Sequence, residues 1–237
     1  MTEREYQGPD SRRVQEMFAA IAHRYDFLNH FLSASVDVRW RSLAVRKVQE
    51  LAAPLSPRHC LDLCSGTGDL ALALHNRIGC EVTASDFCHP MLTRANKKFV
   101  GHAIRNVEAD ALTLPFRDES FDALTIAFGL RNLEDPLRGL IEMRRVLKPR
   151  GAAVILEFSK PVVPVLAFLF NFYFRSVLPK LGGLISGSPT AYQYLPDSVR
   201  TFPSQEELVT LLRRAGFRDP AYRNLSGGIA ALHWART

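Results

Sequence analysis

A short acidic and glycine-rich stretch is the part of the sequence best suited to hold a charged small molecule. Asp62 lies within an apolar run, and Gly66, Thr67, Gly68 and Asp69 follow that run directly. Because glycine has no Cβ, the backbone of such a turn can approach a ligand closely. In open α/β sheets, ligands bind beyond the carboxyl end of a strand that is followed by a turn of this kind. The stretch therefore predicts a small-molecule site at the end of a buried strand.

Polar residues at the ends of the next two predicted strands indicate a nucleoside. Asp86 ends one strand, and a carboxylate there can accept hydrogen bonds from both hydroxyls of a ribose. Asp110 and Ala111 follow the next strand. The carboxylate of Asp110 can accept a hydrogen bond from an adenine amino group, and the small Ala111 leaves room for the ring.

Charge decides between the two classes of nucleoside cofactor that this geometry accepts. Dinucleotides place a pyrophosphate at a helix N-terminus and favour the pattern G-x-G-x-x-G. Here no third glycine follows Gly66 and Gly68, and Asp62 and Asp69 flank the turn, where they would repel a pyrophosphate. The ammonium and sulfonium of S-adenosylmethionine tolerate those carboxylates. The pattern therefore predicts S-adenosylmethionine as the cofactor.

The elements that must position these residues alternate between strand and helix from residue 58 onward. Such units imply a parallel sheet that is covered by helices on both faces. Ser204 and Glu207 form a capping-box pattern at the start of the last helix, and Gly216 ends that helix. Two short strands, near Tyr222 and over 230–234, are expected to pair antiparallel. The other predicted strands cover 59–63, 81–85, 105–109, 121–128 and 152–158, and the helices between them cover 67–77, 91–100 and 135–147.

Together the elements predict an α/β fold that is Rossmann-like, with a mostly parallel seven-stranded sheet and an antiparallel C-terminal strand. Two helices precede the sheet, one beginning at Asp10 or Ser11 and one over 40–51. We expect residues 1–57 to form an N-terminal helical lid or substrate segment. Residues 58–237 are expected to form the methyltransferase domain, with an aromatic helical insertion at about 161–200.

Composition narrows the classes of partner. The net charge is +6, but the Lys and Arg residues are scattered without a dense basic run, so no nucleic-acid partner is expected. The four cysteines lack the paired spacing of zinc or redox sites, which indicates a reducing, cytoplasmic setting. The polar N-terminus has no signal-peptide core. The most apolar stretch, 162–174, is shorter than the ~20 residues of a membrane span.

The motifs resemble those of class I S-adenosylmethionine-dependent methyltransferases, at residues 61–69, 86, 110 and 146–149. More specific stretches make the chain similar, from about 14 to 233, to the ubiquinone/menaquinone biosynthesis C-methyltransferases. These stretches are Tyr25-Asp26-Phe27-Leu28-Asn29, Phe128-Gly129-Leu130-Arg131-Asn132, Glu157-Phe158-Ser159-Lys160-Pro161, Tyr194-Leu195 with Ser198-Val199-Arg200, and residues 224–233.

The resemblance implies that Thr67, Asp86, Asp110 and Ala111 line the cofactor site. Ala127 stands where the family has a small polar residue that contacts the cofactor, so one side-chain hydrogen bond is expected to be absent. Ser65 and Arg150 replace glycines that are common in the pattern. Residues 35–40 lack the glycine and the His-Arg pair that family members usually carry there.

The resemblance also implies methylation of a ring carbon of a lipid-soluble polyprenylated quinol. Arg131 and Asn132 follow the strand 121–128 at the carboxyl edge of the sheet. We expect Arg131 to stabilise a phenolate, Asn132 to orient the hydroxyl or a water, and Tyr25 to complete the set from the lid. A salt bridge from Arg131 to Glu134 or Asp135, and core packing for Tyr25, are the alternatives. The histidines at 23, 30 and 233 are candidate bases by chemistry alone.

The aromatic stretch 162–174 leaves several interpretations open. It suits a wall for the prenyl tail, a peripheral contact with the inner face of the membrane, a buried core helix or the face of a homodimer. Other activities also compete with quinol methylation. They are methylation of another lipophilic or phenolic small molecule, methylation of RNA, and a non-catalytic assembly role that retains the fold.

Overall fold

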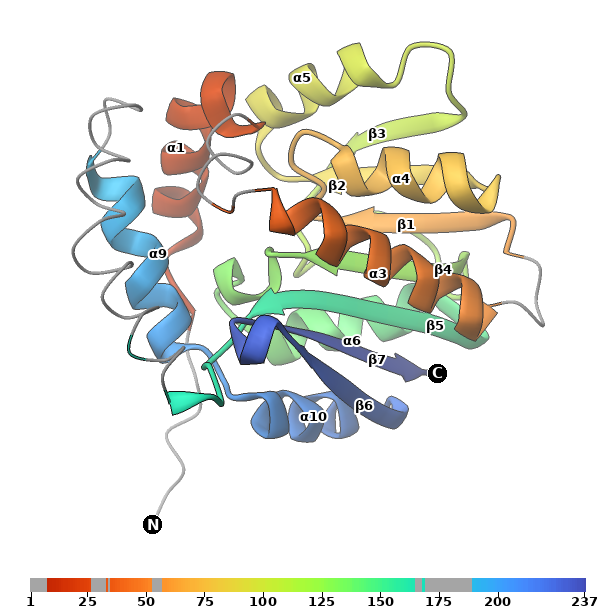
Figure 1. Ribbon diagram of the computed structural model, residues 1–237. Helices are drawn as coiled ribbons and strands as arrows, with labels where there is room; N and C mark the ends of the chain where they lie inside the picture. Colours follow the sequence, from red (N-terminus) through yellow and green to blue (C-terminus); the bar gives the residue numbers. More distant parts are fainter. Residues whose placement is uncertain (1–7, 27–32, 34, 53–56, 165–167, 169–188) are drawn as a thin grey trace.

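The computed structural model describes residues 8–26, 33, 35–52, 57–164, 168 and 189–237. These residues build one seven-stranded sheet of order β3-β2-β1-β4-β5-β7-β6 (Figure 1). The first five strands are parallel, and β7 runs antiparallel to both β5 and β6. The strands are β1 (His59–Leu63), β2 (Glu81–Asp86), β3 (Ile104–Glu108), β4 (Phe121–Ala127), β5 (Leu147–Phe158), β6 (Arg218–Leu225) and β7 (Ala230–Arg236). The predicted fold class is confirmed.

Helices cover both faces of the sheet, because successive residues of a buried strand point to opposite sides. On β1, Cys60 packs with apolar residues of α3, α4 and α5, whereas Leu61 and Leu63 pack with α6 and α10. The helices and single 3₁₀ turns are α1 (Ser11–Ile21), η1 (Ala22–Arg24), α3 (Val36–Ala52), α4 (Asp69–Ile78), α5 (His89–Lys98), η3 (Leu130–Asn132), α6 (Pro136–Val146), α9 (Pro189–Thr201), α10 (Gln205–Arg214) and η5 (Ser226–Gly228).

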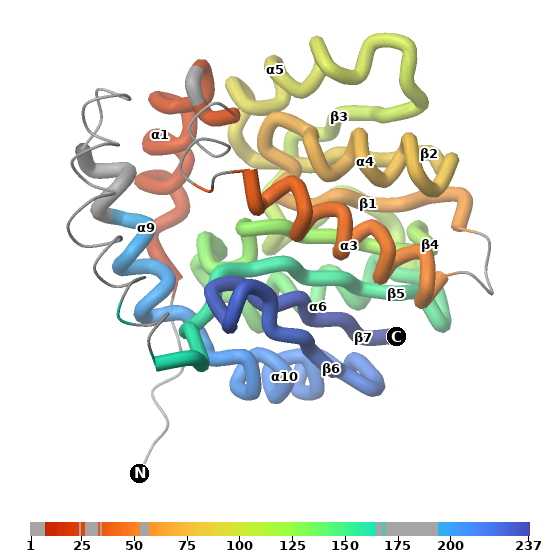
Figure 2. The backbone as a smooth tube through the Cα atoms, viewed as in Figure 1, coloured from red at the N-terminus to blue at the C-terminus, as the bar shows by residue number. Residues whose placement is uncertain are grey.

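The segment expected to act as a lid divides into two parts. Helix α3 begins at Val36. Its buried Trp40, Val45 and Val48 belong to the core on the face of the sheet that α3, α4 and α5 cover. Helices α1 and α9 contact each other and lie beyond the carboxyl ends of the parallel strands (Figures 1 and 2). Of the described residues in the predicted lid, those of α1 therefore lie beyond the strand ends (Figure 1), whereas those of α3 belong to the core. Most of the aromatic stretch 162–174, namely residues 165–167 and 169–174, lies outside the described residues, as do residues 175–188 of the expected insertion.

Strand β5 begins at Leu147 rather than at residue 152, because the chain pairs with β4 as soon as it leaves α6. Leu147 pairs with Phe121, and a register irregularity follows before Ala152 pairs with Ala123. Arg150, which replaces a glycine of the family pattern, has a φ of 66° within this irregular part. A left-handed backbone costs a residue with a Cβ about 1–2 kcal/mol.

We expect Arg150→Gly to raise the free energy of unfolding by about 0.5–1 kcal/mol, because glycine removes the left-handed strain at a smaller entropic cost in the unfolded chain. The urea midpoint of unfolding measures the change. Arg117→Gly is the matched control: Arg117 is also exposed but has no positive φ, so that substitution should lower stability. Equal shifts in the two variants would contradict the assignment of strain to Arg150.

Candidate active site

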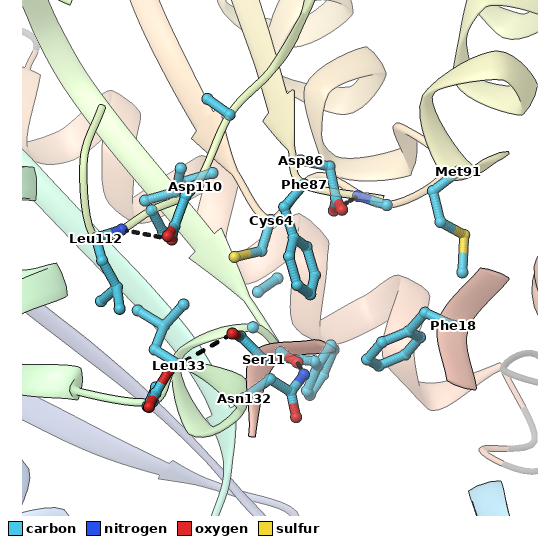
Figure 3. A pocket seen from close by; sticks show the side chains of 18 of the residues that line it. Ser11, Phe18, Cys64, Asp86, Phe87, Met91, Asp110, Leu112, Asn132 and Leu133 are labelled. Atoms are coloured by element: carbon cyan, nitrogen blue, oxygen red, sulfur yellow. Dashed lines mark hydrogen bonds between the residues drawn. The ribbon is translucent and has the colours of Figure 1, made fainter. Parts of the chain in front are cut away.

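A cleft opens at the carboxyl ends of β1, β2 and β4 (Figure 3), and its empty space, including the part that is open to solvent, is about 710 Å³. Its floor comes from the turns after these strands, and its cover comes from α1 and the residue that follows η1. Apolar and polar side chains share the lining, which includes Ser11, Phe18, Tyr25, Cys64, Gly66, Asp86, Phe87, Met91, Asp110, Ala111, Ala127, Phe128, Gly129, Asn132, Leu133 and Glu134. A smaller, more polar cleft adjoins it and shares Tyr25, Cys64, Gly66, Ala127 and Phe128.

The glycine turn is fastened to the next strand by Asp86. One carboxylate oxygen of Asp86 accepts from the backbone N–H of Gly66 at 2.8 Å, and the other accepts from the N–H of Cys88 at 2.9 Å. Burial raises the pKa of Asp86, and these backbone hydrogen bonds oppose the rise. Gly68 is left-handed, and a Cβ there would lie 2.3 Å from the ring of Phe99. Gly66 therefore lines the cleft, whereas Gly68 admits the close packing of α5.

Asp62 is a buried acid with one oxygen left for a ligand. The hydroxyl of Thr125 donates to Oδ1 at 2.7 Å, while Oδ2 has no hydrogen-bond partner among the described residues. Asp62 lines the smaller cleft with Thr67 and Arg41. Burial raises the pKa of Asp62 to about 7, although Thr125 and Arg41 act against it. A buried carboxylate of this kind gains most from a cationic ligand.

The residues predicted for the adenine side lie around the larger cleft. Asp110 is exposed at its rim, where Oδ1 accepts from the N–H of Leu112 at 2.9 Å. Ala111 is buried in the wall, and Ala127 lines both clefts with no polar side-chain atom to offer. Phe87, which follows Asp86 directly, adds an aromatic surface that the sequence analysis did not single out.

A seam of ion pairs joins the end of the N-terminal cover to the glycine turn. Lys98 lies 2.8 Å from Asp26 and 2.6 Å from Asp69, and Arg41 contacts Asp69 at 3.6 Å. The hydroxyl of Thr67 donates to Asp26 within the same seam. Burial alone would raise the pKa of Asp26, but the hydrogen bonds from Lys98 and Thr67 outweigh burial and hold it below its usual value. Thr67 is thus engaged with the cover as well as lining the polar cleft.

Arg131 and Asn132 were both predicted to act on the substrate, but their side chains lie in different surroundings. Asn132 lines the larger cleft, and its Nδ2 donates to the carbonyl of Phe128 at 3.2 Å. Arg131 is buried, does not line either cleft, and pairs with Glu157 at 2.8 Å. This ion pair is with Glu157, and not with Glu134 or Asp135, the partners considered from the sequence.

Glu157 is the buried counterpart of Arg131. It also accepts from the backbone N–H groups of Arg131 and Phe158, at 3.2 and 2.8 Å. Burial raises the pKa of Glu157, and the charge of Arg131 opposes that rise. The pair therefore ties the turn after β4 to the end of β5, from behind the cleft.

Two non-glycine residues are left-handed where the central strands enter the cleft. Cys64 after β1 has a φ of 52°, and Phe128 after β4 has a φ of 58°. A Cβ on Gly129 would lie 2.4 Å from the Cβ of Cys64, so the two turns pack directly against each other. Strain of this kind gathers at functional sites.

The histidines considered as bases lie away from both clefts or outside the described residues. His233 is buried on β7, stacks on Tyr222 and contacts the carbonyl of Gln205 at 3.1 Å, and burial lowers its pKa to about 4. His23 is exposed in η1, and His30 is not described. Tyr25 lines both clefts and packs edge-on against Phe18.

The residues present fit S-adenosylmethionine. The buried, unpaired oxygen of Asp62 at the wall of the smaller cleft suits an ammonium, the buried Asp86 lies where a ribose would follow, and Asp110 stands at the rim beside Phe87 and Ala111. Among the described residues beyond its chain neighbours, only the ring of Tyr25, at 3.8 Å, lies within 4 Å of a Cβ added to Gly66, so the described part of the chain leaves space above this turn.

The strand order and this cleft define the class of Rossmann-like, S-adenosylmethionine-dependent methyltransferases. The fold matches the crystal structure of such a methyltransferase from Aquifex aeolicus, with a TM-score of 0.56 and 21% identity, covering 76% of this chain and 81% of that one. It also matches the [4+2]-cyclase SpnF, with a TM-score of 0.71 and 17% identity over 99% of both chains.

The chain belongs to the ubiE/COQ5 methyltransferase family, whose model matches residues 6–237. It is 49% identical over 220 residues to a demethylmenaquinone methyltransferase of Thermus thermophilus, covering 92% of this chain and 98% of that protein. It is 45% identical to a ubiquinone/menaquinone biosynthesis C-methyltransferase of a Geobacter species, covering 93% of this chain and 94% of that protein. The predicted family is confirmed, and the protein is a methyltransferase.

We expect cofactor binding to release protons below pH 7, because a bound cation favours the carboxylate form of Asp62, whose pKa burial raises to about 7. Affinity should rise by up to about tenfold per pH unit as the pH approaches that value from below. Calorimetry in two buffers of different ionisation enthalpy measures both effects. Asp62→Asn should bind about tenfold more weakly and lose this pH dependence; the same pH dependence in both proteins would remove Asp62 from the site.

We expect Arg131→Ala to lower the free energy of unfolding by about 3–5 kcal/mol, because Glu157 then lacks its buried counter-charge. The pKa of Glu157 in the folded variant would then rise further above its value in the unfolded chain. As the pH rises, Glu157 would lose its proton in the unfolded chain first, so the free energy of unfolding would fall. Urea unfolding at pH 5 and pH 8 should show the larger loss at pH 8. Adding Glu157→Gln should restore part of the stability; a loss that is equal at both pH values argues against the pairing.

Proposed function

We propose that this methyltransferase transfers a methyl group to a ring carbon of a polyprenylated quinol, with demethylmenaquinol as the first substrate and the benzoquinol of the ubiquinone pathway as the second. The observation that carries the proposal is the mixed lining of the larger cleft. Asp86 and Asp110 suit a cationic nucleoside, and the same cleft is lined by the apolar Phe18, Phe128 and Leu133 and by the amide of Asn132. The names of the relatives, which act in menaquinone and ubiquinone biosynthesis, support the same substrate class.

When bound, S-adenosylmethionine supplies an electrophilic methyl group on a sulfonium. The protein's own residues must then align and ionise the quinol. Asn132, which lines the larger cleft with Phe128 and Leu133, can donate to a ring oxygen and favour its ionised form. Tyr25 borders both clefts, so its side chain lies where cofactor and quinol meet. Arg131 acts through Glu157 and the turn after β4, as a positioning residue that holds Asn132 in place.

We also propose that residues 8–26 act as the lid over the methyltransferase domain. Phe18 and Tyr25 reach from this segment into the cleft, and Asp26 ties it to Thr67 and Lys98. A lid that excludes water strengthens every electrostatic interaction beneath it. The control of water is useful here, because an ionised ring oxygen competes with solvent for the hydrogen bond of Asn132.

The purified protein should methylate a short-chain demethylnaphthoquinol in the presence of S-adenosylmethionine, and the oxidised quinone should stay unchanged because it has no hydroxyl to ionise. Mass spectrometry of the product, in which one methyl replaces one ring hydrogen, measures the reaction. The benzoquinol tested in parallel distinguishes the two pathways. Turnover of unrelated lipophilic phenols with no turnover of either quinol would favour the alternative substrate class.

The lid side of the molecule is also proposed to touch the membrane that holds such a quinol. Val162, Val163 and Phe168 are exposed, with Phe168 at 72% of its full surface. Among the described residues, no helix has the length and hydropathy needed to cross a bilayer. The exposed group can therefore rest on a lipid surface at most, or it can form the face of a homodimer.

Replacing Val162 and Phe168 with Ser should lower the fraction that sediments with liposomes, because exposed apolar side chains drive interfacial binding. Val100→Ser is the matched control, since Val100 is 80% exposed at a distance from the cleft, after α5. Size-exclusion chromatography of the same variants detects a change in oligomeric state. Unchanged sedimentation together with a smaller apparent mass would assign this surface to a dimer.

A further inference from the structure

Tyr194, on α9, contacts the side chain that the proposed reaction uses. Its hydroxyl donates to Oδ1 of Asn132 at 2.8 Å. Helix α9 contacts the turn η3, which carries Asn132, although the two are far apart in the sequence. Tyr194 itself is not among the residues that line either cleft, whereas Asn132 points into the larger one (Figure 3). The contact by which Tyr194 can act on the reaction is therefore its hydrogen bond to Asn132.

Two contacts together fix which way the amide of Asn132 faces. The carbonyl of Phe128 can only accept, so the atom that contacts it at 3.2 Å must be Nδ2. The opposite end, Oδ1, then meets a hydroxyl that can donate. Nδ2 carries two N–H groups, and Phe128 uses one. The second has no partner among the described residues and is left for an oxygen in the cleft.

We propose that Tyr194 is a positioning residue for methyl transfer. It holds the Asn132 amide so that an N–H group, rather than a carbonyl oxygen, meets the quinol hydroxyl as it ionises. This inference rests on the proposed function. Without the Tyr194 hydroxyl, Oδ1 loses its donor and the amide can rotate. A carbonyl oxygen would then face the developing phenolate and repel it, so the transition state would lose a donor and gain a like partial charge.

Tyr194→Phe is the direct test, because it keeps the ring and removes only the hydroxyl. We expect kcat for the quinol to fall about tenfold, as for the loss of one hydrogen bond, with KM for S-adenosylmethionine unchanged. The apparent pKa on the acid limb of kcat should rise by about one unit, the same factor. Tyr222→Phe is the matched control, since it removes a tyrosine hydroxyl that donates to Glu206 at 3.2 Å on edge strand β6. That control should leave kcat unchanged.

A double-mutant cycle separates positioning from simple support of α9. Asn132→Ala should lower kcat about 100-fold, and adding Tyr194→Phe should lower it no further. A further tenfold fall in the double variant would show that Tyr194 acts elsewhere and would overturn the proposal. Unchanged kcat in Tyr194→Phe would overturn it equally.

A second readout does not depend on turnover. A nitro-substituted naphthol, whose phenolate absorbs visible light, is bound in the presence of S-adenosylhomocysteine and titrated with pH. Its bound pKa should be higher in Tyr194→Phe than in the unaltered protein and in Tyr222→Phe. If the unaltered protein methylates no quinol, the proposed function fails, and this titration still decides the role of Tyr194. Equal bound pKa values in all three proteins would overturn that role.

Discussion

Removing a carboxylate from water costs several kcal/mol, and this protein does so repeatedly at one edge of its sheet. Glu157, at the end of β5, is compensated from within the chain by Arg131. Asp62, at the end of β1, is compensated only in part, and one of its oxygens has no partner among the described residues. Glu157 therefore holds the turn after β4 in place, whereas Asp62 would be stabilised by a positively charged ligand.

The shape of the cleft follows from how closely its turns approach one another. Cys64 and Phe128 accept left-handed conformations, and the missing side chain of Gly129 lets the turn after β4 rest on Cys64. Gly68 does the same for Phe99 at the end of α5. These contacts bring three strand ends within reach of one small molecule. The conformational strain is confined to these turns, while the apolar packing that offsets it extends over both faces of the sheet.

The parts of the fold that depend on local sequence could be predicted from it. The strands, the capping box at Ser204 and the acids at the ends of β1 and β2 could be predicted because apolar periodicity and turn residues act over a few positions. The helix was predicted to begin at residue 40, whereas α3 begins at Val36. The charged residues Asp37 and Arg39 interrupt the apolar pattern that would have indicated this first turn. Within the site, Phe87 carried a usable signal, since it directly follows the ribose-side acid Asp86.

Contacts between distant residues could not be predicted in the same way. Arg131 and Glu157 both lie in motifs that the sequence singled out, yet nothing in their spacing says that the two side chains face each other rather than the cleft. The contact between Tyr194 and Asn132 depends likewise on how α9 folds back over η3. Side-chain direction at the end of a strand is set by tertiary packing, and the roles of these residues follow from it.

The seam between Asp26, Lys98 and Asp69 has a consequence for how often the cover can be lifted. An apolar contact at this place would expose hydrophobic surface each time it opened, and exposed hydrophobic surface promotes aggregation. Charged groups regain water when they separate, so they can part and meet again many times at little net cost. A lid of the kind proposed for residues 8–26, which would admit an apolar quinol beside a water-soluble cofactor, gains from contact faces that stay compatible with solvent when they separate.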